Sequence, residues 1–161
     1  MFEREITINE FLIGSFNKVI VDIPEETFFQ NSVGHEHSPV WILGHLAIVG
    51  ELGQRLLGGR MSHSDWMRPF GPGSVDKIAP CEEFRKANMT SILTDAYDSL
   101  RSLALTANEE TVSQAHQVAL LEGTPIKTVG DLVTHLLTSH FSFHLAQLSS
   151  CRRAAGLSCL Y

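Results

Sequence analysis

The chain has 161 residues, of which 43% are hydrophobic, and a formal net charge of −6. This length suits one globular domain with a single hydrophobic core, so we expect one domain over residues 1–161. The acidic balance, without any run of Lys or Arg, argues against binding to a nucleic-acid backbone.

The N-terminal segment and the cysteines indicate where the protein works. Charged residues interrupt the apolar residues of positions 1–21, which predicts neither a signal peptide nor a membrane span. Cys81, Cys151 and Cys159 are odd in number and lack CxxC spacing, so neither a disulfide framework nor a thiolate zinc site is predicted. We therefore expect a cytoplasmic protein without a membrane partner.

The first half of the chain predicts two helices. Apolar residues recur at helical spacing over residues 7–22, and Thr7 with Glu10 forms a capping-box signature at the start of that range. Ser38, followed by a proline, predicts the N-terminus of a second helix over residues 39–57, which should end at the glycine pair that follows.

The middle of the chain predicts a long loop and then a third helix. Residues 58–80 contain too many Gly, Pro and Ser residues for a regular element, and Trp66 and Phe70 are candidate aromatic anchors for this loop. Loops of this length in compact domains are often functional. After Pro80, apolar residues repeat every three or four positions, which predicts the third helix.

The C-terminal part predicts a fourth helix. Residues 106–128 are ambiguous, since their pattern fits either a short strand or an extended loop. Thr128 and Asp131 then form a second capping-box signature, opening a helix that ends near Gly156. Four long helices with little strand signal predict an all-α fold, a four-helix bundle with a long loop between helices 2 and 3.

Three of the eight histidines fall on apolar helix faces. His140 and His144 lie about 40° apart around the fourth helix, and His45 lies on the apolar stripe of the second. Each unpaired buried polar group costs about 1–3 kcal/mol, so three buried imidazoles need partners. One divalent metal ion would provide a partner for all three and keep an open coordination position. The alternative is three hydrogen-bonded core histidines without a metal.

The remaining histidines are weaker candidates. His135 lies about 180° from His144 around the helix, so we expect it to face outward or toward a partner chain. His35 and His37 precede the second helix, where they would cap the mouth of the site, add a ligand or belong to a solvated loop. His63 and His116 are interpreted as surface residues.

Known catalytic signatures are missing from the sequence. No Glu follows His140 in the manner of HExxH, and there is no GxSxG elbow or phosphate-binding glycine loop in a strand and helix context. Chemistry at this site would therefore come mostly from the metal.

Three segments, "SPVWILGHLA", "WMRPFGPGS" and "TPIKTVGDLVTHLLTSHFSFHLAQLSSCRRAAGL", resemble in this order the DinB/YfiT-like family of metalloenzymes. The resemblance implies a four-helix bundle whose ligands correspond to His45, His140 and His144. It also implies one divalent ion, nickel or zinc, and a homodimer. The family's usual glycine before Gln147 is Ala146 here, so Gln147 takes no fixed family role and is a candidate pocket-lining residue.

The resemblance also suggests an activity. Characterised relatives include S-transferases that use low-molecular-weight thiols such as bacillithiol or mycothiol. We therefore expect a metal-dependent transferase or hydrolase that acts on a small molecule, with the loop around Trp66 lining its pocket. The alternative is a non-catalytic helical dimer, or a stress protein that binds a small ligand, in which the histidines are structural.

Overall fold

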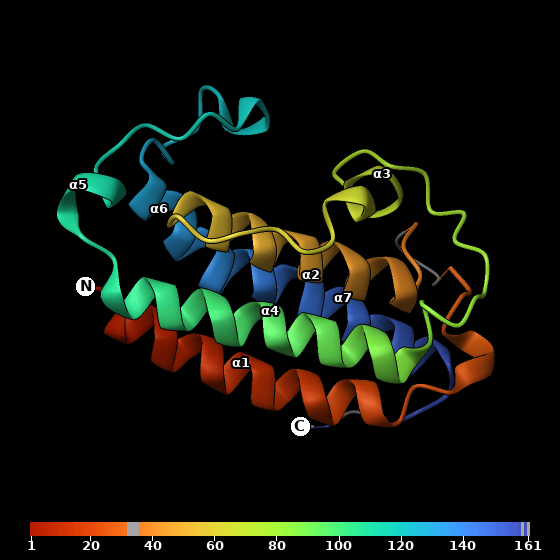
Figure 1. Cartoon of the computed structure of the whole chain (residues 1–161). Helices are drawn as coiled ribbons and strands as arrows, with labels where there is room; N and C mark the ends of the chain where they lie inside the picture. Colours follow the sequence, from red (N-terminus) through yellow and green to blue (C-terminus); the bar gives the residue numbers. More distant parts are fainter. Residues whose placement is uncertain (32–35, 159, 161) are drawn as a thin grey trace.

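The computed structural model describes residues 1–31, 36–158 and 160, and its ordered elements are helical (Figure 1). Within these residues the one β contact is an isolated bridge between Ala115 and Thr128. The prediction of an all-α fold is therefore confirmed.

Four long helical stretches run alongside one another (Figure 1). They are α1 (Glu3–Val21), α2 (Pro39–Leu56), α4 (Lys86–Thr106), and a C-terminal stretch made of α6 (Val129–His135), the π-helical turn η4 (Leu136–His140) and α7 (Phe141–Ala154). Short elements occupy the connections: η1 (Glu25–Thr27), η2 (Ser64–Trp66), α3 (Met67–Phe70), α5 (Glu109–Val112) and η3 (Ala119–Leu121).

The long helices share one core. Helix α2 packs against α4 and α7, while α1 packs against α7 and α4. Large side chains from these helices meet in the centre, among them Phe16, Leu43, Tyr97 and Phe141. Burial of each such side chain stabilises the fold by about 1.5–3 kcal/mol. The histidine-bearing helices α2 and α7 are thereby held as neighbours.

Two helix starts agree with their sequence signatures. The Ser38 hydroxyl accepts a hydrogen bond from the Trp41 N–H (3.4 Å) at the start of α2. At the start of α6 the Asp131 N–H donates to the Thr128 hydroxyl (3.1 Å), and the Thr128 N–H donates to the Asp131 carboxylate (2.9 Å). Both caps satisfy main-chain donors that the first helical turn leaves unpaired.

The predicted start of the first helix is wrong. Helix α1 begins at Glu3, and the Thr7 hydroxyl donates to the Glu3 carbonyl (2.9 Å) in place of capping the helix. Phe2 is buried against the core, and acidic residues occupy the first turn, where they interact favourably with the helix dipole. Core packing therefore extends the helix beyond its sequence signature.

The loop before α4 is more regular than predicted, since it contains η2 and α3. Its two anchors are confirmed: Trp66 and Phe70 are buried, and both pack edge-on against Phe84. The Trp66 indole also donates to Glu83 (2.8 Å), which keeps residues 81–85 on this cluster and delays the start of α4 to Lys86. The ambiguous segment 106–128 likewise contains α5 and η3, with the single bridge as its one strand-like contact in the described structure.

The last helix is not regular, because η4 inserts a π turn between α6 and α7. A π turn uses i→i+5 hydrogen bonds and occurs often at functional sites. The fully buried Asn9 side chain of α1 donates to the Leu137 carbonyl inside this turn (2.8 Å), and Arg101 of α4 donates to the Asn9 side-chain oxygen (2.8 Å). Helices α1 and α4 thus support the turn that precedes His144.

Candidate metal centre

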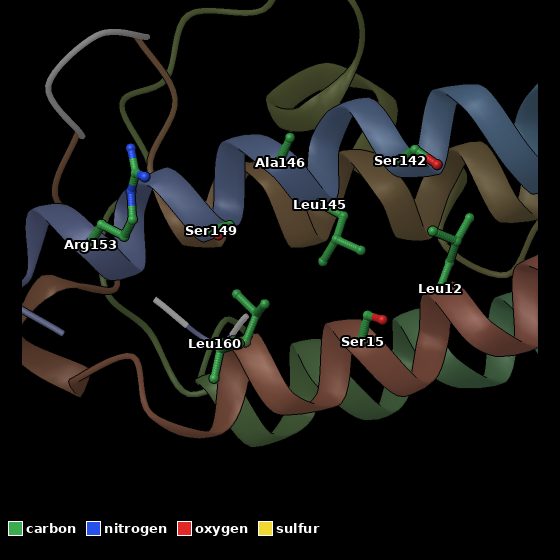
Figure 2. Close-up of a pocket in the computed structure, with 9 residues that line it drawn as sticks. Leu12, Ser15, Ser142, Leu145, Ala146, Ser149, Arg153 and Leu160 are labelled. Atoms are coloured by element: carbon green, nitrogen blue, oxygen red, sulfur yellow. The ribbon is translucent and has the colours of Figure 1, made fainter. Parts of the chain in front are cut away.

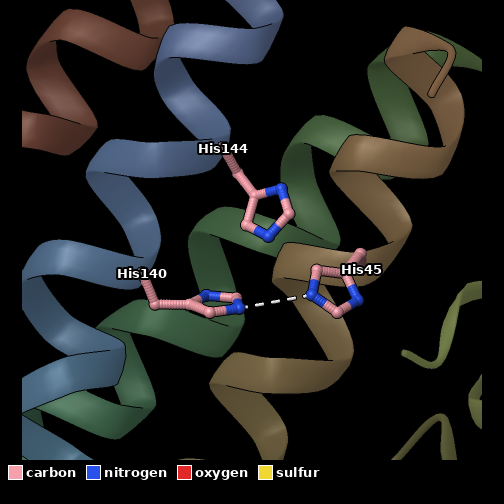
Figure 3. A group of neighbouring side chains, drawn as sticks. All are labelled: His45, His140 and His144. Carbon is pink, nitrogen blue, oxygen red and sulfur yellow. Dashed lines mark hydrogen bonds between the residues drawn. The ribbon is translucent and has the colours of Figure 1, made fainter. Parts of the chain in front are cut away.

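Three histidines from two neighbouring helical stretches converge in the interior (Figure 3). His45 comes from the middle of α2, His140 ends the π turn η4, and His144 lies one turn later on α7. Their candidate ligand nitrogens all lie within 4.8 Å of one another. His45 and His144 are buried and His140 is partly buried. The structure therefore brings together the three histidines that the sequence singled out, close enough to bind a metal ion.

The main chain fixes the tautomer of His45. Its Nδ1 lies 2.8 Å from the Phe70 carbonyl oxygen. A carbonyl only accepts hydrogen bonds, so Nδ1 carries the proton and Nε2 has the free electron pair. Nε2 is the nitrogen that faces His140. Such an outer hydrogen bond, which orients the ring and leaves the other nitrogen for coordination, is typical of metal-binding histidines.

Gln147 fixes the tautomer of His144. Its side-chain oxygen accepts a hydrogen bond from His144 Nδ1 (2.7 Å), which makes Nε2 the unprotonated nitrogen. The sequence suggests Gln147 as a candidate pocket-lining residue, but in the structure it contacts Nδ1 of His144, the ring nitrogen that would not bind the metal. The spacing of three residues along α7 was the available signal for this contact.

His140 completes the cluster. Its Nε2 lies 3.3 Å from His45 Nε2. Two nitrogens bound at 2.0–2.1 Å to a tetrahedral ion are about 3.3–3.4 Å apart, so this pair already has the spacing that such an ion requires. In the described part of the chain, His140 Nδ1 is buried without a hydrogen-bond partner. The residues present therefore fit a divalent ion.

A close helix-to-loop approach explains why His45 meets a carbonyl. Gly44 faces the Phe70 ring so closely that a Cβ at position 44 would lie 2.4 Å from Phe70 Cδ1. The missing side chain lets the loop residue pack directly on α2, where its carbonyl reaches the next residue of the helix. The "GH" pair of α2 thus supplies both the space and the ligand.

Electrostatics keep His45 and His140 in their neutral, ligand form. Burial, followed by repulsion from His144, His45 and His135, lowers the pKa of His140 to about 2. Burial is also the largest cause that lowers the pKa of His45, with the Phe70 hydrogen bond acting in the opposite direction and His37 adding to the decrease. Neutral imidazole is the form that coordinates metals.

The cluster opens onto a cavity of about 470 Å³, which we call the histidine pocket. Its lining consists of Trp41, His45, Pro72, Leu120, His135, Ser139, His140, Phe143 and His144. The long loop contributes Pro72 to this lining. The predicted long loop therefore reaches this pocket, whereas Trp66 itself is not a lining residue and packs against Phe70.

His135, which the sequence predicts to face outward or toward a partner chain, is partly exposed but also lies beside the cluster. His135 precedes His140 by five residues, the spacing that a π-helical hydrogen bond spans, and the two ring centroids are 5.5 Å apart. A regular helix would have separated them by about 140°. His135 therefore lines the histidine pocket, where its Nδ1 lies 2.7 Å from the Ser139 hydroxyl.

His37 also differs from the solvated-loop interpretation. Its ring stacks on Trp41 with centroids 3.6 Å apart, and Trp41 stacks in turn on His45 at 4.7 Å. His37 is outside the group of close ligand nitrogens. His35 lies outside the described residues.

The two histidines interpreted as surface residues are partly buried and fasten loops. His63 Nδ1 lies 2.6 Å from the buried Glu51 carboxylate of α2, which also accepts from the His63 N–H (2.8 Å). His116 contacts the Ile126 carbonyl through Nε2 (3.0 Å) and accepts from the Val118 N–H at Nδ1 (3.2 Å). Sequence spacing alone gave no signal for these contacts.

A second cavity, of about 400 Å³, lies between α1 and α7 (Figure 2). Its lining is mainly aliphatic and serine side chains, with Arg153 at one end. Because no His, Cys, Asp or Glu is among these lining residues, the cavity offers none of the usual protein ligands for a divalent ion. The histidine pocket is therefore the better candidate for a metal centre.

Fold and site together define an all-helical protein with an oriented three-histidine cluster at the base of a pocket. Comparison with models of known families, with curated proteins and with solved structures found no match.

Proposed function

We propose that the chain binds one divalent metal ion, nickel or zinc, through His45, His140 and His144. We further propose that it is a metal-dependent enzyme, a low-molecular-weight-thiol S-transferase or a hydrolase. The observation that carries this proposal is the convergence of three imidazole rings, two of which have their tautomer set by an outer hydrogen bond. Aliphatic side chains at these three positions would have a lower desolvation cost, since buried polar groups must be paired.

The pocket residues suit a catalytic site. When bound, an ion with three neutral ligands retains its charge and lowers the pKa of a thiol or a water molecule. The Phe70 carbonyl and Gln147 hold two of the imidazole rings in place. Trp41 forms a wall beside His45, and the open side of the pocket admits a small substrate.

The wider interpretation follows the sequence resemblance. Four long helices that pack around one core support the proposal of a DinB/YfiT-like four-helix bundle. We also propose a homodimer, which the resemblance implies, and a cytoplasmic location, which follows from the cysteine pattern and the charged N-terminal segment. Within the described residues, no helix combines the length and apolar character needed to cross a bilayer.

Elemental analysis tests the metal. Untagged protein purified without chelators is compared with the triple variant His45→Ala/His140→Ala/His144→Ala. The control is His116→Ala, which changes a histidine that is not among the close ligand nitrogens. We expect about one nickel or zinc ion per chain in the wild type and the control, and none in a triple variant that remains helical by circular dichroism. Metal missing from all three proteins after reconstitution would favour the packed-core interpretation.

Turnover tests the catalytic role. His144→Ala should abolish turnover of thiol and electrophile pairs while its helical content is unchanged. Activity retained in this variant would contradict a catalytic metal centre.

A further inference from the structure

The cavity between α1 and α7 lies beside an exposed aromatic side chain. This cavity of about 400 Å³ is lined mainly by aliphatic and serine side chains, among them Leu12, Ser15 and Leu145 (Figure 2). Phe11 directly precedes Leu12 on α1 and is 71% exposed, and Ile8, one turn earlier, is 48% exposed. Exposed apolar side chains grouped beside an apolar cavity mark an interaction surface more often than scattered ones do.

The outer face of α1 has an ordered stripe of side chains. At about 100° per residue, four exposed residues lie within about 40° of one another around the helix: Arg4, Phe11, Lys18 and Asp22. We call them the α1 stripe. Ile8 lies about 60° from Phe11, on the side of the cavity. A cation therefore occupies the N-terminal end of the stripe and a carboxylate its C-terminal end, with an aromatic ring between them.

The α1 stripe is complementary to itself when two copies pair in antiparallel directions. With a two-fold axis near residue 13, Arg4 of one copy faces Asp22 of the other, and Phe11 faces Ser15. Because Ser15 lines the cavity, the Phe11 ring of each copy enters the cavity of the other. Parallel pairing would instead oppose Arg4 to Arg4 and Asp22 to Asp22, which is electrostatically unfavourable.

The residues of this pairing have the capacity for it. Among the described residues Arg4 forms no ion pair, and Asp22, which pairs with Arg152 (2.8 Å), remains 45% exposed. The Ser15 hydroxyl donates to the Phe11 carbonyl (3.1 Å), so its polar hydrogen is already paired where a ring would cover it.

We propose that the α1 stripe and the cavity beside it form the contact between two copies of this chain, with Phe11 of each copy in the cavity of the other. This inference rests on the homodimer of the proposed function and names its interface, while the metal centre is independent of it. Self-complementarity favours a second copy over an unrelated partner, because a two-fold contact requires one surface to supply both the ring and the cavity.

Sedimentation equilibrium of the full chain tests the interface. We expect a dimeric wild type, and Phe11→Glu should raise the dimer dissociation constant at least about a hundredfold, because each dimer loses two buried rings. Phe143→Glu is the matched control, since Phe143 is similarly exposed (62%) but lies at the histidine pocket, and it should leave the dimer unchanged. Circular dichroism should show the same helical content in all three proteins.

Charge reversal tests the antiparallel register. Arg4→Glu should raise the dissociation constant at least about threefold, because a carboxylate then faces Asp22 at both ends of the contact. The control Arg60→Glu reverses an exposed arginine in the loop after α2 and should have no effect. An Arg4→Glu dimer as stable as the wild type would refute this register.

The outcomes separate the interface from the rest of the proposed function. A dimer that survives Phe11→Glu, or that dissociates on Phe143→Glu, overturns the interface and leaves the homodimer in place. A monomeric wild type overturns both, while metal analysis and turnover continue to test the metal centre. If that monomer binds a fluorescent fatty acid and Leu145→Glu abolishes the binding, the cavity belongs to a small apolar ligand instead.

Discussion

Gly44→Ala should weaken metal binding without touching a ligand. The new Cβ would lie 2.4 Å from Phe70 Cδ1, whereas ordinary contacts begin at 3.4 Å, so the buried ring must move by about 1 Å (3.4 − 2.4). If the Phe70 carbonyl follows the ring, its 2.8 Å distance to His45 Nδ1 becomes about 3.8 Å, too long for a hydrogen bond. Loss of such an outer contact typically lowers metal affinity about 10- to 100-fold.

Stability is the less decisive readout for Gly44→Ala. Alanine gains about 1 kcal/mol in a helix interior, while overpacking costs about 1–3 kcal/mol, so the net change in unfolding free energy is between about zero and a loss of 2 kcal/mol. The assay is therefore competition for zinc against a chromophoric chelator, with thermal unfolding recorded beside it.

Two further variants make the Gly44 prediction specific. Gly44→Ala combined with Phe70→Leu gives the Cβ space and should recover most of the affinity. Gly14→Ala, on α1 with no atom within 4 Å of the added Cβ, should leave zinc binding unchanged and stabilise the protein by about 0.5–1 kcal/mol. Zinc affinity of Gly44→Ala within about twofold of the wild type would refute the role assigned to the Phe70 carbonyl.

Three other predictions concern the supports of the cluster. In metal-free protein the pKa of His140 is lower in the folded than in the unfolded state, so the free energy of unfolding decreases as the pH falls below about 6.5. Between about pH 7 and about pH 5.5, protonation of this histidine in the unfolded chain should account for about 1.3 kcal/mol of that decrease. Urea unfolding at both pH values should show a smaller loss for His140→Gln, and equal losses would contradict the assignment. Asn9→Asp keeps an acceptor for Arg101 but removes the donor to the Leu137 carbonyl. We expect this variant to fold and to bind zinc about tenfold more weakly than the wild type. Unchanged zinc binding would show that the π turn does not depend on this hydrogen bond. Gln147→Ala should lower zinc affinity about 10- to 100-fold and Gln147→Glu should retain it, because only the latter keeps an acceptor for the ring N–H; similar affinities in the two variants would contradict the orienting role.

The sequence alone supported the all-helical fold and the choice of His45, His140 and His144. Helical periodicity and two capping signatures located α2 and the start of α6, because these are local effects of spacing and hydrogen bonding. The proposal that the three histidines cluster also came from the sequence, since each lies on an apolar helix face.

Only the tertiary structure decided how the cluster is built. A period of 3.6 residues sends His135 away from His140, and the π turn that brings the two together is supported by Asn9, a residue of a different helix. The tautomer of His45 depends on a carbonyl 25 residues away that reaches it through the gap at Gly44. Spacing along one helix determines which face a side chain occupies, whereas contacts between distant segments determine what it meets there.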